Sequence, residues 1–222
     1  MPFDHNDHYH RLLLRHLPRD ARTALDVGCG TGRFARRLAE RGLTVDAIDP
    51  SAAVIAEARA RTAPSPDAPH FHHADLAESA PPDGHYDFIV CLASLHHMPF
   101  ETVTTLRTAL APGGVLVVLG CYPERTAADW AYGLVAAPTN AAARLAVAAK
   151  ERLRNTPATD HPTKPPVSQP TMPLPDIRRE AARLLPGSRI RRLLFWRYLL
   201  VFHNAPTPPA RSFPRQPPRP LP

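Results

Sequence analysis

The stretch Ala24–Gly32, with the sequence ALDVGCGTG, decides which fold the rest of this chain can adopt. An apolar run ends in a carboxylate at Asp26, three glycines then alternate with other residues, and a helical pattern marked by Phe34 and Leu38 begins at about residue 31. Strand, glycine turn and helix open a nucleotide-binding βαβ unit, in which the backbone must approach a ligand where a side chain would clash. We therefore predict an α/β fold with a ligand site at this turn.

The spacing of the glycines argues against a dinucleotide site. A dinucleotide fingerprint would place its third glycine at position 33, which is Arg33, whereas the third glycine of this chain is Gly32. Asp26 adds a fixed negative charge at the strand end, which is unfavourable for a pyrophosphate and suits a cationic ligand. The pattern resembles motif I of the class I S-adenosylmethionine methyltransferases.

Three later features continue this resemblance in chain order. Asp49 lies 21 residues after Gly28, the interval at which an acidic residue meets a ribose in such folds. Its two carboxylate oxygens can accept both ribose hydroxyls. Asp75 ends the third predicted strand, and a Pro-Gly-Gly turn at 112–114 precedes the fifth. Together these features make the resemblance specific for residues 20–120.

By this resemblance the protein binds S-adenosylmethionine as its cofactor and transfers the methyl group. The glycine loop is implied to hold the methionine portion, Asp49 the ribose, and Asp75 with Leu76 the adenine edge. The full set of implied cofactor-binding residues is Asp26, Gly28, Cys29, Gly30, Gly32, Asp49, Pro50, Asp75, Leu76 and Leu92.

The remaining pattern predicts a doubly wound α/β domain with a seven-stranded, mostly parallel sheet. Apolar or alternating segments predict strands at 24–27, 43–48, 70–76, 86–92, 115–119, 189–195 and 198–202. Helical periodicity predicts helices at 31–41, from 51 onward, at 101–110 and at 175–185. By resemblance, the last two strands form the antiparallel pair that closes the sheet of this family.

Three segments flank or interrupt the predicted methyltransferase domain, residues 21–204. Residues 1–20 form an N-terminal arm with a helix, which is either a polar arm or a flap over the cofactor site. A two-helix insertion at 123–172 follows the fifth strand and is predicted to act as a lid. In residues 205–222, eight of eighteen positions are proline, which predicts a disordered tail.

Composition favours a soluble protein in a reducing cytoplasm. No apolar run approaches the roughly 20 residues that a membrane helix needs, and the polar N-terminus is unlike a secretory signal. The three cysteines are too far apart for a disulfide framework or a zinc site. The histidines His70, His72 and His73 are close together but lack further ligands, so we expect no bound metal. Because no long apolar run is present, we also expect no membrane partner.

The formal charge of +7 comes almost entirely from arginine, which supplies 25 of the 27 basic residues. Seven arginines and only two acids lie in segment 176–197, the basic C-terminal patch. A general bias toward arginine explains the charge as well as an RNA or protein acceptor does. The Asn/Asp-Pro-Pro-Tyr/Phe motif of methyltransferases that modify exocyclic base amines or glutamine amides is absent after the fourth predicted strand. We therefore do not expect a nucleic-acid partner.

Candidate residues on the acceptor side follow the fourth strand and lie in the two flanking segments. His97, and after it His96, are candidate general bases for an oxygen or nitrogen acceptor. The alternative is that one histidine caps the loop and the other is solvated. Tyr9 in the N-terminal arm and Trp130 in the insertion are candidates for contact with the acceptor.

The sequence therefore predicts a methyltransferase that acts on a small molecule, at oxygen or nitrogen. Two alternatives stay open. One is methylation of RNA or protein through the basic C-terminal patch, and the other is a non-catalytic module that binds S-adenosylmethionine. The sequence carries no sign of an oligomeric state.

Overall fold

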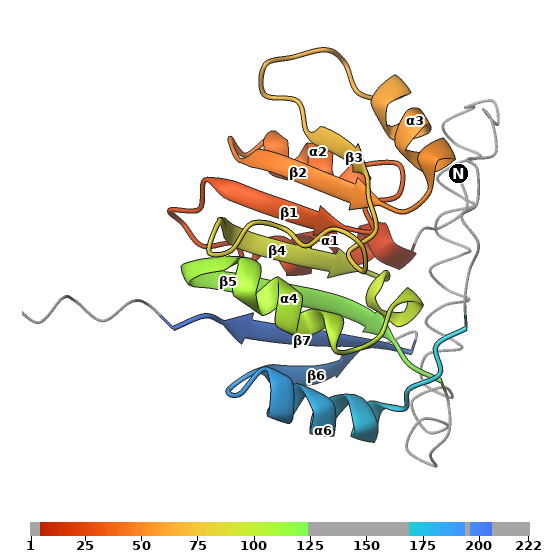
Figure 1. Ribbon diagram of the computed structural model, residues 1–222, viewed down its shortest axis with the longest axis vertical. Coiled ribbons are helices and arrows are strands. Elements are labelled where there is room, and N and C mark those ends of the chain that lie inside the picture. The colour runs from red at the N-terminus through yellow and green to blue at the C-terminus, as the bar shows by residue number, and fades with distance from the viewer. Residues whose placement is uncertain (1–4, 124–168, 194–195, 206–222) are drawn as a thin grey trace, which may run out of the picture.

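A seven-stranded sheet runs through the part of the chain that the structure describes (Figure 1). The computed structural model describes residues 5–123, 169–193 and 196–205. In chain order the elements are α1 (His5–Leu14), β1 (Thr23–Val27), α2 (Arg33–Ala39), β2 (Thr44–Asp49), α3 (Ala52–Ala60), β3 (His70–His73), β4 (Tyr86–Leu92), the 3-10 helix η1 (Leu95–His97), α4 (Thr102–Ala109), β5 (Leu110–Cys121), α6 (Leu174–Leu184), β6 (Arg189–Leu193) and β7 (Arg197–His203).

The sheet has the strand order β3-β2-β1-β4-β5-β7-β6, which confirms the predicted doubly wound topology. Strands β1 to β5 are parallel, while β7 pairs antiparallel with both β5 and β6. The chain order reverses between β1 and β4, where Val27 lies between Ile48 of β2 and Cys91 of β4. Ligands of open α/β sheets bind outside the carboxyl ends of the strands at such a reversal.

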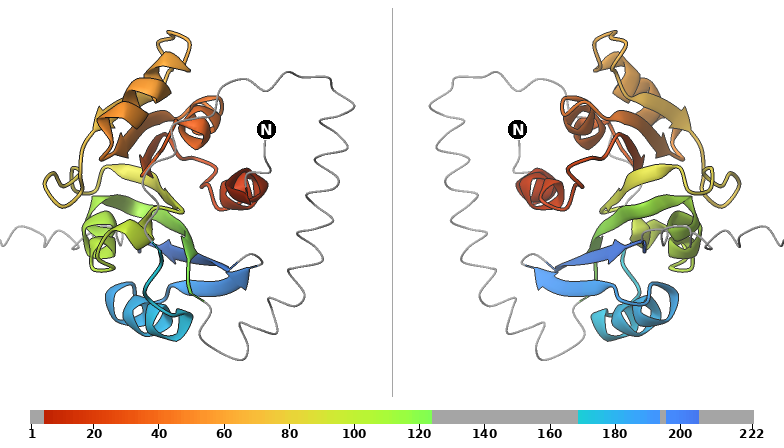
Figure 2. Two further views of the ribbon diagram at one scale, coloured as in Figure 1. Left: turned by 90° about the vertical axis from the view of Figure 1, so that its right-hand side faces the viewer. Right: turned by 90° about the vertical axis from the view of Figure 1, so that its left-hand side faces the viewer.

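The central strands are apolar because helices cover both faces of the sheet. One core cluster joins α1, α2 and α3 to one face, through Tyr9, Leu13, Phe34, Leu38 and Ile55. A second joins α4 and α6 to the opposite face, through Val103, Leu106, Leu174, Ile177 and Ala181. Figure 2 shows α1 on one side of the sheet and α4 and α6 on the other. Full burial of a leucine or phenylalanine side chain contributes about 1.5–3 kcal/mol.

The largest differences from the predicted strand bounds are in the third and fifth strands. The sequence predicts a third strand that reaches residue 76, but β3 ends at His73 because its partner strand ends at Asp49, which pairs with His73. Asp75 therefore lies in the turn after the strand rather than at its end. Strand β5 begins at Leu110 instead of residue 115, since Leu110 already pairs with Tyr86 across an irregularity in the register.

The N-terminal helix packs into the core: Tyr9 and Leu13 of α1 are both buried. The predicted insertion helices, with Trp130, and the tail beyond residue 205 lie outside the described residues. No helix in the described ranges is long and apolar enough to cross a bilayer.

Gly32 and Gly42 provide a matched test of how α2 is held against β3. Both have left-handed backbones, with φ of 73° and 82°, and such a backbone costs an alanine about 1–2 kcal/mol. A methyl group at Gly42 would enter open space, whereas one at Gly32 would lie 2.5 Å from Cζ of Phe71. We expect Gly32→Ala to lower the free energy of unfolding in urea by about 1–3 kcal/mol more than Gly42→Ala. Equal losses would show that Phe71 moves aside without cost.

Candidate functional site

The glycine loop between β1 and α2 is tied to the strands on both sides of the chain reversal. The backbone N–H groups of Gly28 and Cys29 donate to the carbonyl of Ile48, at 2.8 and 3.0 Å. On the other side, a methyl group added at Gly28 would clash with Cβ of Ser94. The loop therefore packs closely against the segment that follows β4. A larger residue at position 28 would displace either the loop or that segment.

Asp49, at the end of β2, is held by two backbone donors. Its Oδ2 accepts from the N–H of Gly30 at 3.0 Å, and its Oδ1 accepts from the N–H of Ser51 at 2.9 Å. The side chain is buried, so these bonds fix its orientation. A carboxylate has about four lone-pair sites in total, which leaves each oxygen able to accept one more hydrogen bond. The neighbouring Pro50 is exposed at the same edge.

Asp26 is a buried carboxylate with no oppositely charged partner in the described residues. Its side chain is 1 % exposed, and neither oxygen has a hydrogen-bond partner in the described residues. Burial, assisted by the charge of Asp49, raises the pKa of Asp26 to about 7, although the N–H of Ala35 in α2 acts in the opposite direction. An unpaired buried charge is costly, so this arrangement favours a cationic ligand that would supply the missing partner.

Asp75 and Leu76 lie in the turn after β3, at the same edge of the sheet. Oδ1 of Asp75 accepts from the N–H of Ala77 at 2.9 Å, and its carbonyl accepts from the N–H of Ser79 at 2.9 Å. Asp75 is exposed while Leu76 is buried against the core. The turn therefore offers one polar and one apolar group side by side.

The segment after β4 is fixed by a strained residue and a buried hydroxyl. Ala93 has a left-handed backbone with φ of 56°, which is unfavourable for any residue with a Cβ. Oγ of the buried Ser94 donates to the carbonyl of Val27 at 2.5 Å. Leu92, just before this turn, is partly buried. The sequence gives no signal for Ala93 or Ser94, because left-handed positions are ordinarily marked by glycine or asparagine.

His96 and His97 differ in their surroundings. His96 is partly buried, its Nδ1 has no partner in the described residues, and it lines a cavity of about 250 Å³ together with Met98, Phe100, Cys121, Met172 and Tyr198. Burial, followed by the charges of His97 and Arg197, lowers the pKa of His96 to about 4. His97 is exposed, with its ring centroid 4.1 Å from that of His96. Of the two histidines, only His96 lines the cavity, and its lowered pKa keeps its imidazole neutral at pH 7.

Histidines on β3 contact an acid rather than one another. Nε2 of His72 lies 2.9 Å from Oδ1 of Asp46, and Oδ2 of Asp46 accepts from the Tyr86 hydroxyl at 2.9 Å. His73 contacts the carbonyl of Pro50 instead. Within the described ranges, no three histidine, cysteine or carboxylate side chains are grouped to hold a metal ion.

Comparison with known proteins identifies the family. A family model described as a methyltransferase domain matches residues 24–114. A methyltransferase of Mycobacterium tuberculosis, itself uncharacterized, is 33% identical over 205 residues, which cover 90% of this chain and 96% of that protein. The trans-aconitate 2-methyltransferase of Variovorax paradoxus is 40% identical over 106 residues, 46% of this chain and 39% of that protein.

The fold is also found in a solved structure of this class. The magnesium protoporphyrin IX methyltransferase of Synechocystis, crystallised with S-adenosylmethionine, superposes with a TM-score of 0.54 at 20% identity, covering 90% of this chain and 78% of that chain. The chain described here belongs to the class I S-adenosylmethionine-dependent methyltransferases. Its cofactor is therefore S-adenosylmethionine.

Asp49 and Asp46 offer a matched test of the ribose site, because both are acids of β2. Asp49→Asn removes the charge that we expect to bind the ribose hydroxyls, whereas Asp46 is engaged with His72 and Tyr86. We expect Asp49→Asn to weaken calorimetric binding of S-adenosylhomocysteine by about 1–3 kcal/mol. Asp46→Asn should leave the affinity within about twofold. Similar affinities for the two variants would place the ribose elsewhere.

Proposed function

We propose that this methyltransferase acts on a small-molecule acceptor, at an oxygen or nitrogen atom. The observation that carries the proposal is the cavity of about 250 Å³ beside His96. It is lined largely by apolar side chains with few polar groups, which is typical of sites for small organic ligands. The partial relative from Variovorax paradoxus is described as acting on trans-aconitate, a small molecule, which is consistent with this proposal.

On the cofactor side, we assign roles from the contacts that the residues leave unused. Asp26 would pair with the amino group of the cofactor, because both of its oxygens lack a partner among the described residues. Asp49 would accept the ribose hydroxyls with its remaining lone pairs. The exposed Asp75 and the buried Leu76 would contact the adenine. The backbone of the loop 28–32 would follow the methionine portion, with Cys29, Pro50 and Leu92 beside it.

The bound cofactor supplies a methyl group activated by a positively charged sulfur. The chain contributes chiefly by position, since holding a nucleophile in line with the methyl carbon removes much of the barrier. The acceptor oxygen or nitrogen gains the methyl carbon and loses its proton. His96, neutral above a pKa of about 4, would accept a hydrogen bond from that O–H or N–H in the cavity and take up the proton. His97, the first candidate from the sequence, is exposed and less suited to this role.

His96→Gln and His97→Gln test this assignment as a pair. We expect His96→Gln to lower kcat/KM for the acceptor about 10- to 100-fold, because it removes the acceptor of a proton in the cavity. His97→Gln should change kcat/KM by less than about threefold, and both variants should bind S-adenosylhomocysteine like the wild type. In saturating cofactor, wild-type activity should stay constant as the pH falls from 8 to about 5 and decline as His96 becomes protonated near pH 4. A larger loss in His97→Gln would reverse the assignment.

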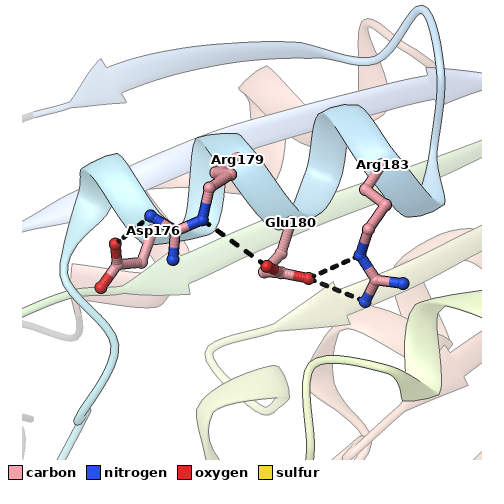
Figure 3. A network of polar contacts seen from close by, with 4 residues as sticks. All are labelled: Asp176, Arg179, Glu180 and Arg183. Carbon is pink, nitrogen blue, oxygen red and sulfur yellow. Dashed lines mark hydrogen bonds and ion pairs between the residues drawn. The ribbon is translucent and has the colours of Figure 1, made fainter.

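The basic C-terminal patch offers less free charge to RNA or an acidic protein than its sequence indicates. On α6, Arg179 lies 2.8 Å from Asp176, and Arg183 lies 2.8 Å from Glu180 (Figure 3). A further contact of 3.7 Å joins Arg179 to Glu180. Two of the seven arginines are thus paired within their own helix. Salt-dependent retention on RNA would nevertheless favour the macromolecular alternative.

Turnover of S-adenosylmethionine with a panel of small molecules tests the proposal directly. Stoichiometric formation of S-adenosylhomocysteine and a methylated product is the expected result. Tight binding of S-adenosylhomocysteine without transfer to any small molecule would favour the non-catalytic module or a macromolecular acceptor.

A further inference from the structure

Tyr198, the second residue of β7, is a buried tyrosine in the wall of the cavity proposed for the acceptor. It is 3 % exposed and lines this cavity together with His96. It belongs to the core cluster on the face of the sheet that α4 and α6 cover. The proton transfer proposed for His96 leaves this phenol without a role, although both side chains line the same space.

The side chain of Tyr198 occupies space on β5 that a glycine leaves free. Tyr198 pairs with Gly120 in the antiparallel register, and a methyl group added at Gly120 would clash with Cε1, Cζ and the hydroxyl oxygen of the tyrosine. Gly120 is not one of the glycines with a positive φ, so its backbone does not itself require glycine. The glycine at position 120 therefore makes room for the tyrosine.

The same face of the sheet leads from Tyr198 to the cofactor side. Side chains alternate along a strand, so Gly120 shares a face of β5 with Val118, which pairs with Cys91 of β4. Tyr198, Val118 and Cys91 accordingly lie in one core cluster. Burial raises the pKa of Cys91, and the charge of Asp26 raises it further. Cys91 thus lies near the carboxylate that we assign to the cofactor and in the same cluster as the phenol.

The hydroxyl of Tyr198 makes no hydrogen bond to another described residue. The hydroxyl of Tyr86, by contrast, donates to Asp46 at 2.9 Å. Burial, followed by the charges of Cys91 and Cys121, raises the pKa of the Tyr198 phenol, so the phenol keeps its proton at pH 7. Such a phenol can both donate and accept hydrogen bonds. A buried hydroxyl without a partner costs free energy unless a ligand supplies one.

The oxygen- and nitrogen-bearing side chains that line the cavity within the described residues form two pairs. Glu101 and Thr171 are exposed and also line an open groove beside α6. Tyr198 and His96 line the cavity but not this groove, and they are buried and partly buried. An acceptor that enters past Glu101 and Thr171 therefore meets Tyr198 and His96 at the inner end.

We propose that Tyr198 binds the acceptor through its hydroxyl, which forms a hydrogen bond with the oxygen or nitrogen atom that receives the methyl group. The apolar body of the acceptor packs against Met98, Phe100 and Met172. This inference rests on the proposed small-molecule function and adds a residue that positions the acceptor. A cavity of about 250 Å³ accommodates a single aromatic ring, because about 150 Å³ suffices for benzene.

Isosteric ligands test this inference without turnover. Phenol, aniline and toluene are titrated calorimetrically into the complex with S-adenosylhomocysteine, using wild type, Tyr198→Phe and Tyr86→Phe. We expect Tyr198→Phe to weaken binding of phenol and aniline about 5- to 30-fold, because their polar group loses its partner. Binding of toluene should change by less than about twofold, so the difference isolates the hydrogen bond. Tyr86→Phe should change all three affinities by less than about twofold.

Two binding results would overturn the inference. One is that phenol and aniline do not bind the wild type. The other is that Tyr198→Phe changes the affinity for toluene as much as the affinities for phenol and aniline.

The stability of the same two variants separates a binding role from a structural one. Because the Tyr198 hydroxyl has no partner in the described residues, Tyr198→Phe should keep or raise the urea midpoint of unfolding. Tyr86→Phe should lower the midpoint, since it removes the hydrogen bond to Asp46. A midpoint of Tyr198→Phe below that of the wild type would show that the fold uses this hydroxyl, and would overturn the inference.

A turnover assay separates this inference from the proposed function. With a small-molecule acceptor, Tyr198→Phe should lower kcat/KM about 10- to 100-fold at unchanged affinity for S-adenosylhomocysteine, because the acceptor is held less well in line. Equally fast transfer by Tyr198→Phe would leave the function standing and overturn the role of Tyr198. Binding of phenol that depends on this hydroxyl, without transfer to any small molecule, would overturn the function while leaving a ligand site.

Discussion

Asp26 is a buried carboxylate near the carboxyl end of β1, and its oxygens have no hydrogen-bond partner in the described part of the chain. The rest of the site depends on this constraint. Burial penalises the ionised form, as its raised pKa of about 7 records. The free protein therefore carries an electrostatic cost above that pH. In the proposed complex the amino group of the cofactor offsets the cost, so the same residue weakens the free fold and strengthens ligand binding.

The cofactor side and the acceptor side are joined through the segment after β4. Ser94 donates to the carbonyl of Val27 and packs against Gly28, while the strained Ala93 turns the chain toward η1. These contacts fix where His96 lies relative to the glycine loop. Strain of this kind persists only where surrounding contacts hold it, and here those contacts come from β1 and β5, whose Leu119 carbonyl accepts from the N–H of Ala93.

The sequence predicts the cofactor side better than the acceptor side, for a physical reason. A tight loop beside a ligand requires glycines, and the proposed ribose site requires an acid at a set interval, such as Asp49. Residue types in the sequence show both requirements directly. The sequence pattern predicts Asp75 at a strand end because it does not show where the partner strand stops. Ala93 carries a left-handed backbone without a residue type that marks it. The pairing of Arg197 with Cys121, which lines the cavity, arises from the register of β5 and β7, which is a tertiary property.

Proton release on binding S-adenosylhomocysteine tests the central claim most directly. Because burial raises the pKa of Asp26 to about 7 in the free protein, part of the population is protonated at pH 7 and should ionise when it pairs with the ligand's amino group. Calorimetric titrations at pH 7, in buffers with different heats of ionisation, should therefore show release of a fraction of a proton per ligand bound. Asp26→Asn should bind more weakly and release none. Binding heats that do not depend on the buffer, or the same release from Asp26→Asn, would contradict the account.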